Sequence, residues 1–113
     1  MCDGGALMSG MRLHYTDRAG YNGIRATPKW LFRASQPPGV HPVGAYFTDY
    51  KEDEPLLAQK LRIPRGKLEF VFCFSDADDL KALPGGRGRH IFYSAVDYIV
   101  SEPRQLRHGE TGL

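Results

Sequence analysis

The stretch Lys67-Leu-Glu-Phe-Val-Phe-Cys-Phe74 is rich in aromatic and β-branched residues. Such side chains pack well on a pleated, half-buried surface, so this stretch predicts a strand, and we expect it to lie centrally in a sheet. Shorter runs on both sides of it predict further strands, at residues 11–16, 30–32, 45–48, 90–94 and 98–100. The sequence contains no internal repeat.

Two short helices are expected between these strands. Asp17 can cap a helix over residues 17–26, because its carboxylate can accept hydrogen bonds from the free amides of the first turn. Pro55 suits the first turn of a second helix, which runs to about residue 61. The segment 35–44 holds three prolines and two glycines and is expected to be a loop.

Many short strands and two modest helices predict an α+β fold built on a mostly antiparallel sheet. The 113 residues have room for one domain, since domains usually span about 50 to 250 residues. We expect residues 1–10 to be a flexible leader and residues 11–113 to be a single domain. The segment 84–88 is interpreted as a hairpin turn rather than a phosphate-binding loop, because it lacks the Lys-Ser/Thr ending.

Composition excludes several classes of protein. With 42% hydrophobic and 25% charged residues, the chain is globular rather than disordered. No apolar stretch approaches the length of about 20 residues that a membrane helix needs, and the N-terminus lacks the pattern of a signal peptide. Cys2 and Cys73 have neither the number nor the spacing of a disulfide framework or a zinc site, and the histidines have no metal-ligand spacing. We therefore expect a cytoplasmic protein without a metal, or an effector delivered as part of a larger polypeptide.

Charge is unevenly distributed along the chain, although the formal net charge is only +2. This balance is far from strongly basic, yet it leaves nucleic acid open as a partner. The pattern indicates either two solvated faces or a basic wall beside a dinucleotide pyrophosphate. Cations concentrate in the first third, at Arg12, Arg18, Arg25, Lys29 and Arg33, and acidic residues cluster at 49–54 and 76–79.

Three segments combine residues that can carry chemistry. The first is Leu13-His-Tyr-Thr16, followed by Gly23-Ile24. The second is Gly44-Ala-Tyr-Phe-Thr-Asp49, and the third is Val96-Asp-Tyr-Ile-Val100 with Gln105 beyond it. Each segment alone is weak as a motif, but their order and spacing together are much more specific.

Taken in order, these segments resemble the ADP-ribosyltransferase superfamily in its diphtheria-toxin and poly(ADP-ribose)-polymerase branch. Within that branch they are most similar to the toxin-like subgroup with a His, Tyr and Asp signature. The resemblance covers residues 11–107, and residues 30–38 look like the family's second strand and the loop over NAD⁺. It implies a compact fold with a split sheet, in which residues 11–113 form an ADP-ribosyltransferase-like catalytic domain.

The resemblance implies the catalytic residues His14, Tyr46 and Asp97. Tyr46 would stack on the nicotinamide ring, and His14 would hydrogen-bond a ribose hydroxyl of the adenosine half. Asp97 would bind the nicotinamide ribose and stabilise the positive charge that develops on the sugar when its bond to nicotinamide breaks. The polymerase branch mostly has Glu at this position, which makes polymer elongation doubtful. Glu102 is the competing carboxylate.

NAD-binding residues follow from the same resemblance. Thr16, or the backbone of Tyr15, would bind the nicotinamide carboxamide, and Arg33 matches a basic position near the adenosine and pyrophosphate. Four of these residues also have an interpretation without a ligand. Thr16 would then be an ordinary strand threonine and Arg33 a surface arginine. His14 would be a strand histidine with its hydrogen bonds satisfied, and Tyr46 a core tyrosine.

The function implied is that of an NAD-dependent mono-ADP-ribosyltransferase with NAD as a substrate and a protein or nucleic-acid acceptor. An NAD glycohydrolase would use the same residues, and a non-catalytic module that binds NAD, ADP-ribose ends or RNA is a third hypothesis. Ala95 stands two residues before Asp97, so the two-carboxylate pattern of arginine-modifying members is absent. We expect a monomer with no membrane contact, and a carrier or immunity protein as a partner implied by the resemblance.

Overall fold

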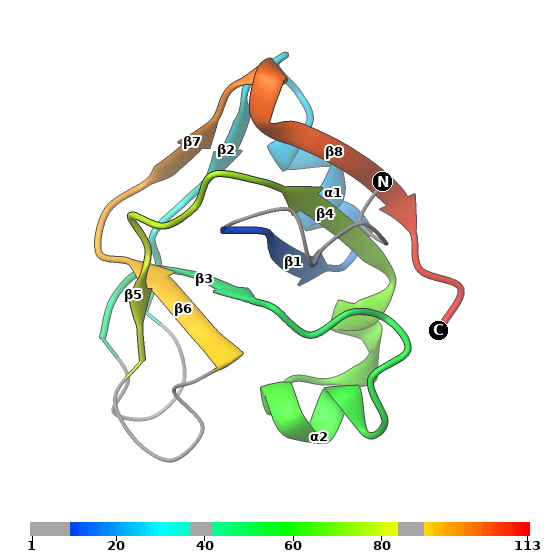
Figure 1. The fold of residues 1–113 in the computed structure, drawn as a ribbon. Coiled ribbons are helices and arrows are strands. Elements are labelled where there is room, and N and C mark those ends of the chain that lie inside the picture. Colours follow the sequence, from blue (N-terminus) through cyan, green and yellow to red (C-terminus); the bar gives the residue numbers. More distant parts are fainter. Residues whose placement is uncertain (1–9, 37–41, 84–89) are drawn as a thin grey trace.

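The computed structural model describes residues 10–36, 42–83 and 90–113. They form one six-stranded antiparallel sheet with the strand order β5-β6-β3-β1-β4-β8 and a separate two-stranded sheet of β2 and β7 (Figure 1). The α+β class with a mostly antiparallel sheet is confirmed. The strands are β1 (Arg12–Thr16), β2 (Trp30–Phe32), β3 (Ala45–Thr48), β4 (Phe70–Phe74), β5 (Lys81–Ala82), β6 (Ile91–Ser94), β7 (Tyr98–Val100) and β8 (Gln105–Glu110). The α-helices are α1 (Arg18–Ile24) and α2 (Leu57–Leu61), and residues Arg65–Leu68 and Glu102–Arg104 form 3-10 turns.

Alternation along β4 divides the core into two parts, one on each face of the six-stranded sheet. We call them the aromatic cluster and the aliphatic cluster. The aromatic cluster consists of Tyr21, Ile24, Trp30, Phe32, Ala45, Phe47, Phe70, Phe72, Phe74, Ala77, Leu80, Tyr98 and Val100. The aliphatic cluster consists of Met11, Leu13, Tyr15, Leu57, Leu68, Val71 and Cys73.

Different elements cover the two faces. Helix α1 and the β2–β7 pair contribute their buried residues to the aromatic cluster, so together they form a layer over that face (Figure 1). Helix α2 contributes Leu57 to the aliphatic cluster on the other face. The polar residues of β1 alternate with Leu13 and Tyr15, so they point to the face of the sheet that this layer covers.

Helix α1 begins as the sequence predicts. Asp17 is the N-cap, and its Oδ1 accepts a hydrogen bond of 2.9 Å from the Gly20 amide. Its Oδ2 pairs with Lys67 at 2.7 Å. A Cβ on Gly20 would overlap the Thr16 hydroxyl, so this glycine lets α1 approach the end of β1.

Several predicted boundaries are wrong. Helix α1 ends at Ile24, short of residue 26, and α2 begins at Leu57, because Leu56 takes up a left-handed conformation after Pro55. The strand predicted over 67–74 begins only at Phe70, since the preceding residues form a 3-10 turn. The predicted strands 30–32, 45–48 and 98–100 have the bounds expected, and those at 11–16 and 90–94 each begin one residue later.

The sheet also differs from the prediction in its order. Strand β4 is completely buried, but it is second from the edge, and β1 and β3 occupy the middle. Strand β8 was not predicted, because Gln105–Glu110 is polar and contains a glycine. It pairs along β4 from Glu110 opposite Phe70 to Gln105 opposite Phe74.

Some expectations fall outside the described residues: leader positions 1–9, loop positions 37–41 and the whole turn 84–88. No helix in the described part of the chain is long and apolar enough to cross a membrane. Cys73 is completely buried, and no free cysteine occurs among the described residues. Cys73 is instead disulfide-bonded, which the number and spacing of the cysteines did not predict.

Candidate functional site

The six-stranded sheet opens between β1 and β3. Strand β1 pairs with β4 at every position from Arg12 to Thr16, but it pairs with β3 only through Leu13 and Thr48. Beyond that pair, the His14 ring bridges the two strands, with Nδ1 2.8 Å from the carbonyl oxygen of Tyr46. A carbonyl can only accept, so Nδ1 carries a proton, and a neutral His14 keeps Nε2 as a hydrogen-bond acceptor.

The surroundings of His14 favour its neutral form. Its ring lies edge-on to Phe32 at 4.9 Å between centroids and 5.6 Å from Phe47. Burial lowers the pKa of His14, the bond to the Tyr46 carbonyl partly opposes this, and the charge of Lys67 lowers the pKa further. At neutral pH the site therefore presents an uncharged imidazole with a fixed tautomer.

Tyr46 meets His14 through its backbone and not through its ring. Phe47 contacts the His14 ring, and side chains alternate along a strand, so the Tyr46 ring points to the other face of β3. There it stacks on Tyr93, its pairing partner in β6, at 5.7 Å and 19° between planes. Its hydroxyl donates to the carbonyl of Pro42, and burial beside Tyr93 raises the pKa of Tyr46.

Asp97 is exposed and lies just before β7. Its Oδ1 accepts a hydrogen bond of 2.8 Å from the amide of Ala34, two residues beyond Phe32. Because the Phe32 ring contacts His14, the imidazole and this carboxylate lie near the same end of β2. The turn before Asp97 is fixed by Ser94, whose hydroxyl donates to the carbonyl of Val96 at 2.7 Å.

The remaining predicted site residues have unequal positions. Thr16 is buried beside Gly20, on the face of β1 that carries His14. The Tyr15 ring points to the aliphatic cluster, where its hydroxyl donates to the Tyr50 carbonyl at 2.8 Å. Arg33 is exposed just beyond β2.

Two residues that follow β7, Gln105 and Glu102, differ in their contacts. The Gln105 side chain donates to the carbonyls of Pro28 at 2.8 Å and Val100 at 3.1 Å, which ties β8 to the β2–β7 pair. Glu102 is exposed in a 3-10 turn after β7. The Gln105 side chain therefore holds strands together. Of the two candidate carboxylates, the one that a backbone amide holds in the described part of the chain is that of Asp97, not that of Glu102.

Two site components were missed by reasoning from the sequence. Phe32 could have been found, because alternation in the segment 30–32 places it inward with Trp30. The amide of Ala34 has no signal in the sequence, since any residue supplies a backbone N–H. Its role depends on how β2 and β7 pair, with Phe32 opposite Tyr98.

Other histidines are held by partners of their own. His90 Nδ1 lies 2.9 Å from Asp49 Oδ1, and its ring stacks on Tyr50 at 4.5 Å. His108 Nδ1 lies 2.7 Å from the Tyr21 hydroxyl. Across residues 10–36, 42–83 and 90–113, no three His, Cys, Asp or Glu side chains are grouped to hold a metal ion.

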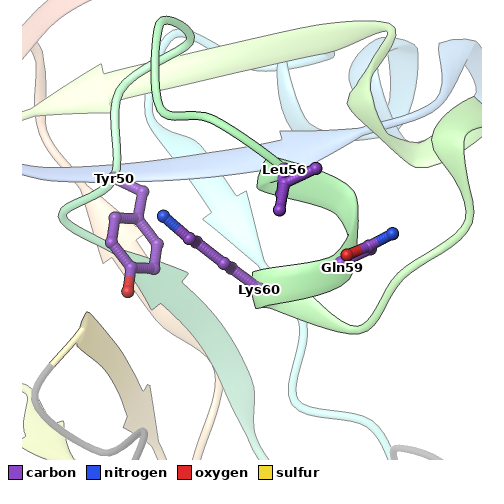
Figure 2. A pocket seen from close by; sticks show the side chains of 4 residues that line it. All are labelled: Tyr50, Leu56, Gln59 and Lys60. Atoms are coloured by element: carbon purple, nitrogen blue, oxygen red, sulfur yellow. The ribbon is translucent and has the colours of Figure 1, made fainter.

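A surface hollow of about 200 Å³ lies beside α2, lined by Tyr50, Leu56, Gln59 and Lys60 (Figure 2). Tyr50 packs against the aliphatic cluster, so the hollow is on the face away from the His14 ring. The Lys60 ammonium lies between Glu54, at 2.5 Å, and the Tyr50 ring, at 5.6 Å from its centroid. The hollow is thus separate from the candidate site.

Comparison with known proteins returned no match to a family model, a curated protein or a solved structure. The class defined by the fold is therefore a compact α+β protein with a mostly antiparallel sheet. Its candidate site consists of His14, the Tyr46 carbonyl and the anchored carboxylate of Asp97.

Proposed function

We propose that the protein is an NAD-dependent mono-ADP-ribosyltransferase with an ADP-ribosyltransferase-like fold. It would break the bond between nicotinamide and ribose and transfer ADP-ribose to a macromolecular acceptor. The observation that carries this proposal is the arrangement of His14, tied to the Tyr46 carbonyl, and Asp97, tied to the Ala34 amide, near one end of β2. The order of the three sequence segments supports it independently.

His14 positions the substrate in this proposal. The hydrogen bond from Nδ1 to Tyr46 fixes the ring, so Nε2 can accept a hydrogen bond from a ribose hydroxyl of the adenosine half. A neutral ring suits this role, because a protonated one would lose the acceptor. Positioning of this kind lowers the entropic part of the barrier.

Asp97 supplies the electrostatic stabilisation. Breaking the glycosidic bond sends its electron pair to nicotinamide and leaves positive charge on the ribose. The carboxylate is exposed, and one of its oxygens is held by Ala34, so the other can bind the ribose hydroxyl and face the developing charge. The acceptor then donates a lone pair to the sugar carbon and releases a proton.

Nicotinamide would enter at the opening between β1 and β3. Thr16, or the backbone of Tyr15, binds the carboxamide, Tyr46 offers an aromatic face, and Arg33 approaches the pyrophosphate. The side chain of a strand residue keeps to one face of the sheet, and the Tyr46 ring is stacked on Tyr93 on the face of β3 away from His14. Stacking of Tyr46 on a nicotinamide beside the His14 ring would therefore require β3 itself to rearrange, and NAD⁺ binding is expected to break the Tyr46–Tyr93 contact.

The experiment is incubation with NAD⁺ labelled in its ADP-ribose half, with and without cell extract, while nicotinamide release and labelled macromolecules are followed. Transfer predicts label on protein or nucleic acid only with extract, and none with the Asp97→Ala variant. Nicotinamide release with no label would identify an NAD glycohydrolase instead. No release above that of Asp97→Ala under either condition contradicts both enzymatic functions.

A further inference from the structure

The layer formed by α1 and β2 exposes cations without counter-ions. Arg18, Arg25 and Lys29 are all exposed, and the segment 18–36 also contains Arg33 but no Asp or Glu. None of these four cations makes an ion pair within the described ranges. By contrast, Glu52 and Glu54, near α2, are each paired with a cation. Positive charge is therefore in excess on this layer, although the net charge of the whole chain is only +2.

Geometry places Arg18, Arg25 and Lys29 on the outside of this layer, and we call them the cationic surface. Arg18 and Arg25 are seven residues apart on α1 and its cap, about two turns, so they lie on one side of the helix. Their guanidinium groups lie over Phe70 at 5.0 Å and Tyr21 at 4.8 Å. Lys29 precedes the buried Trp30, so alternation turns it outward.

The cationic surface leads to Asp97. Strand β2 continues from Lys29 towards Ala34, whose amide holds the Asp97 carboxylate. On the paired strand β7, Ile99 lies opposite Leu31 and is 54% exposed. An extended molecule lying along α1 and the β2–β7 pair (Figure 1) would therefore reach the Asp97 carboxylate. The exposed residues along this path are partly cationic and partly apolar.

We propose that the cationic surface docks the phosphate backbone of a single-stranded nucleic acid, which is the acceptor of ADP-ribose. This inference rests on the proposed function and names its acceptor class. The cations are spread along the layer and do not converge on one point, which suits a chain of phosphates better than one small anion. Arginine also matches the geometry of phosphate oxygens.

The transfer step is balanced without a further reagent. A ring nitrogen or an oxygen of the nucleic acid donates its lone pair to the ribose carbon, and nicotinamide leaves with the electrons of the bond that breaks. The proton lost by the attacking group goes to solvent.

Docking is tested without NAD⁺ by the fluorescence anisotropy of a labelled single-stranded oligonucleotide over a series of salt concentrations. Each phosphate contact contributes about 0.7 to the slope of log affinity against log salt. The triple variant Arg18→Gln, Arg25→Gln, Lys29→Gln should therefore lose about 2 from this slope. The matched variant Arg62→Gln, Arg65→Gln, Lys81→Gln removes the same charge from exposed positions outside this layer and should keep the slope.

The single variant Lys29→Gln controls for misfolding, because the Lys29 side chain, unlike those of Arg18 and Arg25, packs on no aromatic ring among the described residues. It should lower the slope of log affinity against log salt by about 0.7. Equal losses in the surface and matched variants, or equally tight binding of a polyglutamate peptide, would overturn the docking surface. With labelled NAD⁺ added, the oligonucleotide should become labelled. Nicotinamide release without that label contradicts a nucleic-acid acceptor and leaves the proposed function standing. Absence of any release contradicts the proposed function, while the salt slopes still decide on the docking surface.

Discussion

The two faces of β1 differ in chemistry: one is apolar and the other carries polar side chains. Leu13 and Tyr15 join the aliphatic cluster, where α2 covers an apolar surface. On the other face, Arg12 and His14 lie among the aromatic rings, with the Arg12 guanidinium 3.8 Å above Phe92 and the His14 ring against Phe32. The Nε of Arg12 is buried, with no hydrogen-bond partner in the described part of the chain.

The polar face of β1 is expected to contribute less to stability than the apolar face. Burial of polar groups costs free energy unless they are hydrogen-bonded, so the face with Arg12 and His14 is a poor place to gain stability. The aliphatic face has no such cost. Substitution of Leu13 should therefore change stability alone, whereas substitution of His14 should change the reaction and the pH dependence of stability.

Leu13→Ala should have the largest effect on stability. The Leu13 side chain is fully buried, and truncation of such a residue leaves a cavity and costs about 2–5 kcal/mol. Urea unfolding measures the loss, and nicotinamide release per folded molecule should not change. A loss of stability below 1 kcal/mol would contradict the role given to the aliphatic face.

Gly20→Ala should destabilise the protein by about 1–3 kcal/mol, because the added methyl group overlaps the Thr16 hydroxyl. Gly23→Ala is the matched control on the same helix. A Cβ there meets no atom within 4 Å, and alanine favours the helix, so this variant should gain about 0.5–1 kcal/mol. Thermal unfolding of both variants compares the signs, and the same sign for both would refute the close approach of α1 to β1.

Lowering the pH should destabilise the protein through His14. Its pKa is lowered in the folded state, chiefly by burial, from an ordinary value near 6.5. Below that ordinary value the unfolded chain takes up a proton that the folded protein does not, so stability is complete above it and falls as the pH falls. The slope is at most about 1.4 kcal/mol per pH unit.

Urea unfolding between neutral pH and the onset of carboxylate titration measures this slope. His14→Gln keeps a side-chain amide that can donate to the Tyr46 carbonyl, and it should remove this part of the pH dependence. If the two proteins show the same pH dependence in this range, His14 is not held neutral by burial.

Lys67→Gln should have the smallest effect. The ion pair of Lys67 with Asp17 is 2.7 Å long but half-exposed, and such pairs contribute about 0.2–1 kcal/mol. Unfolding in low salt should reveal this loss, and high salt should remove the difference between the variant and the unchanged protein. A difference that persists in high salt would point to packing rather than charge.

The sequence predicts local features of the fold well and the pairing poorly. Residue type and alternation are enough for β3 and for the cap at Asp17. They are not enough for β8, which is polar and becomes a strand only because β4 offers it an edge. The 3-10 turn before β4 has the same origin, since tertiary packing decides where the run of strand-forming residues becomes extended.

The candidate site shows the same limit. The three segments identify His14, Tyr46 and Asp97, but they do not reveal that His14 contacts the backbone of Tyr46 or that Asp97 is held by an amide of Ala34. Both contacts join residues more than 30 positions apart. Such contacts depend on strand register, which residue type alone does not determine.

The rate of nicotinamide release from NAD⁺ by purified protein is the most direct test of the central claim, measured beside Asp97→Asn and Asp53→Asn. Both variants replace an exposed carboxylate with an amide of the same size, but only Asp97 is bonded to Ala34, two residues beyond the Phe32 ring that contacts His14. We predict that Asp97→Asn lowers the rate by about 10²–10³-fold, the usual loss when one electrostatic stabiliser is removed. Asp53→Asn should leave the rate unchanged. No release by the unchanged protein, or equal rates for all three, would contradict the claim that this site cleaves NAD⁺.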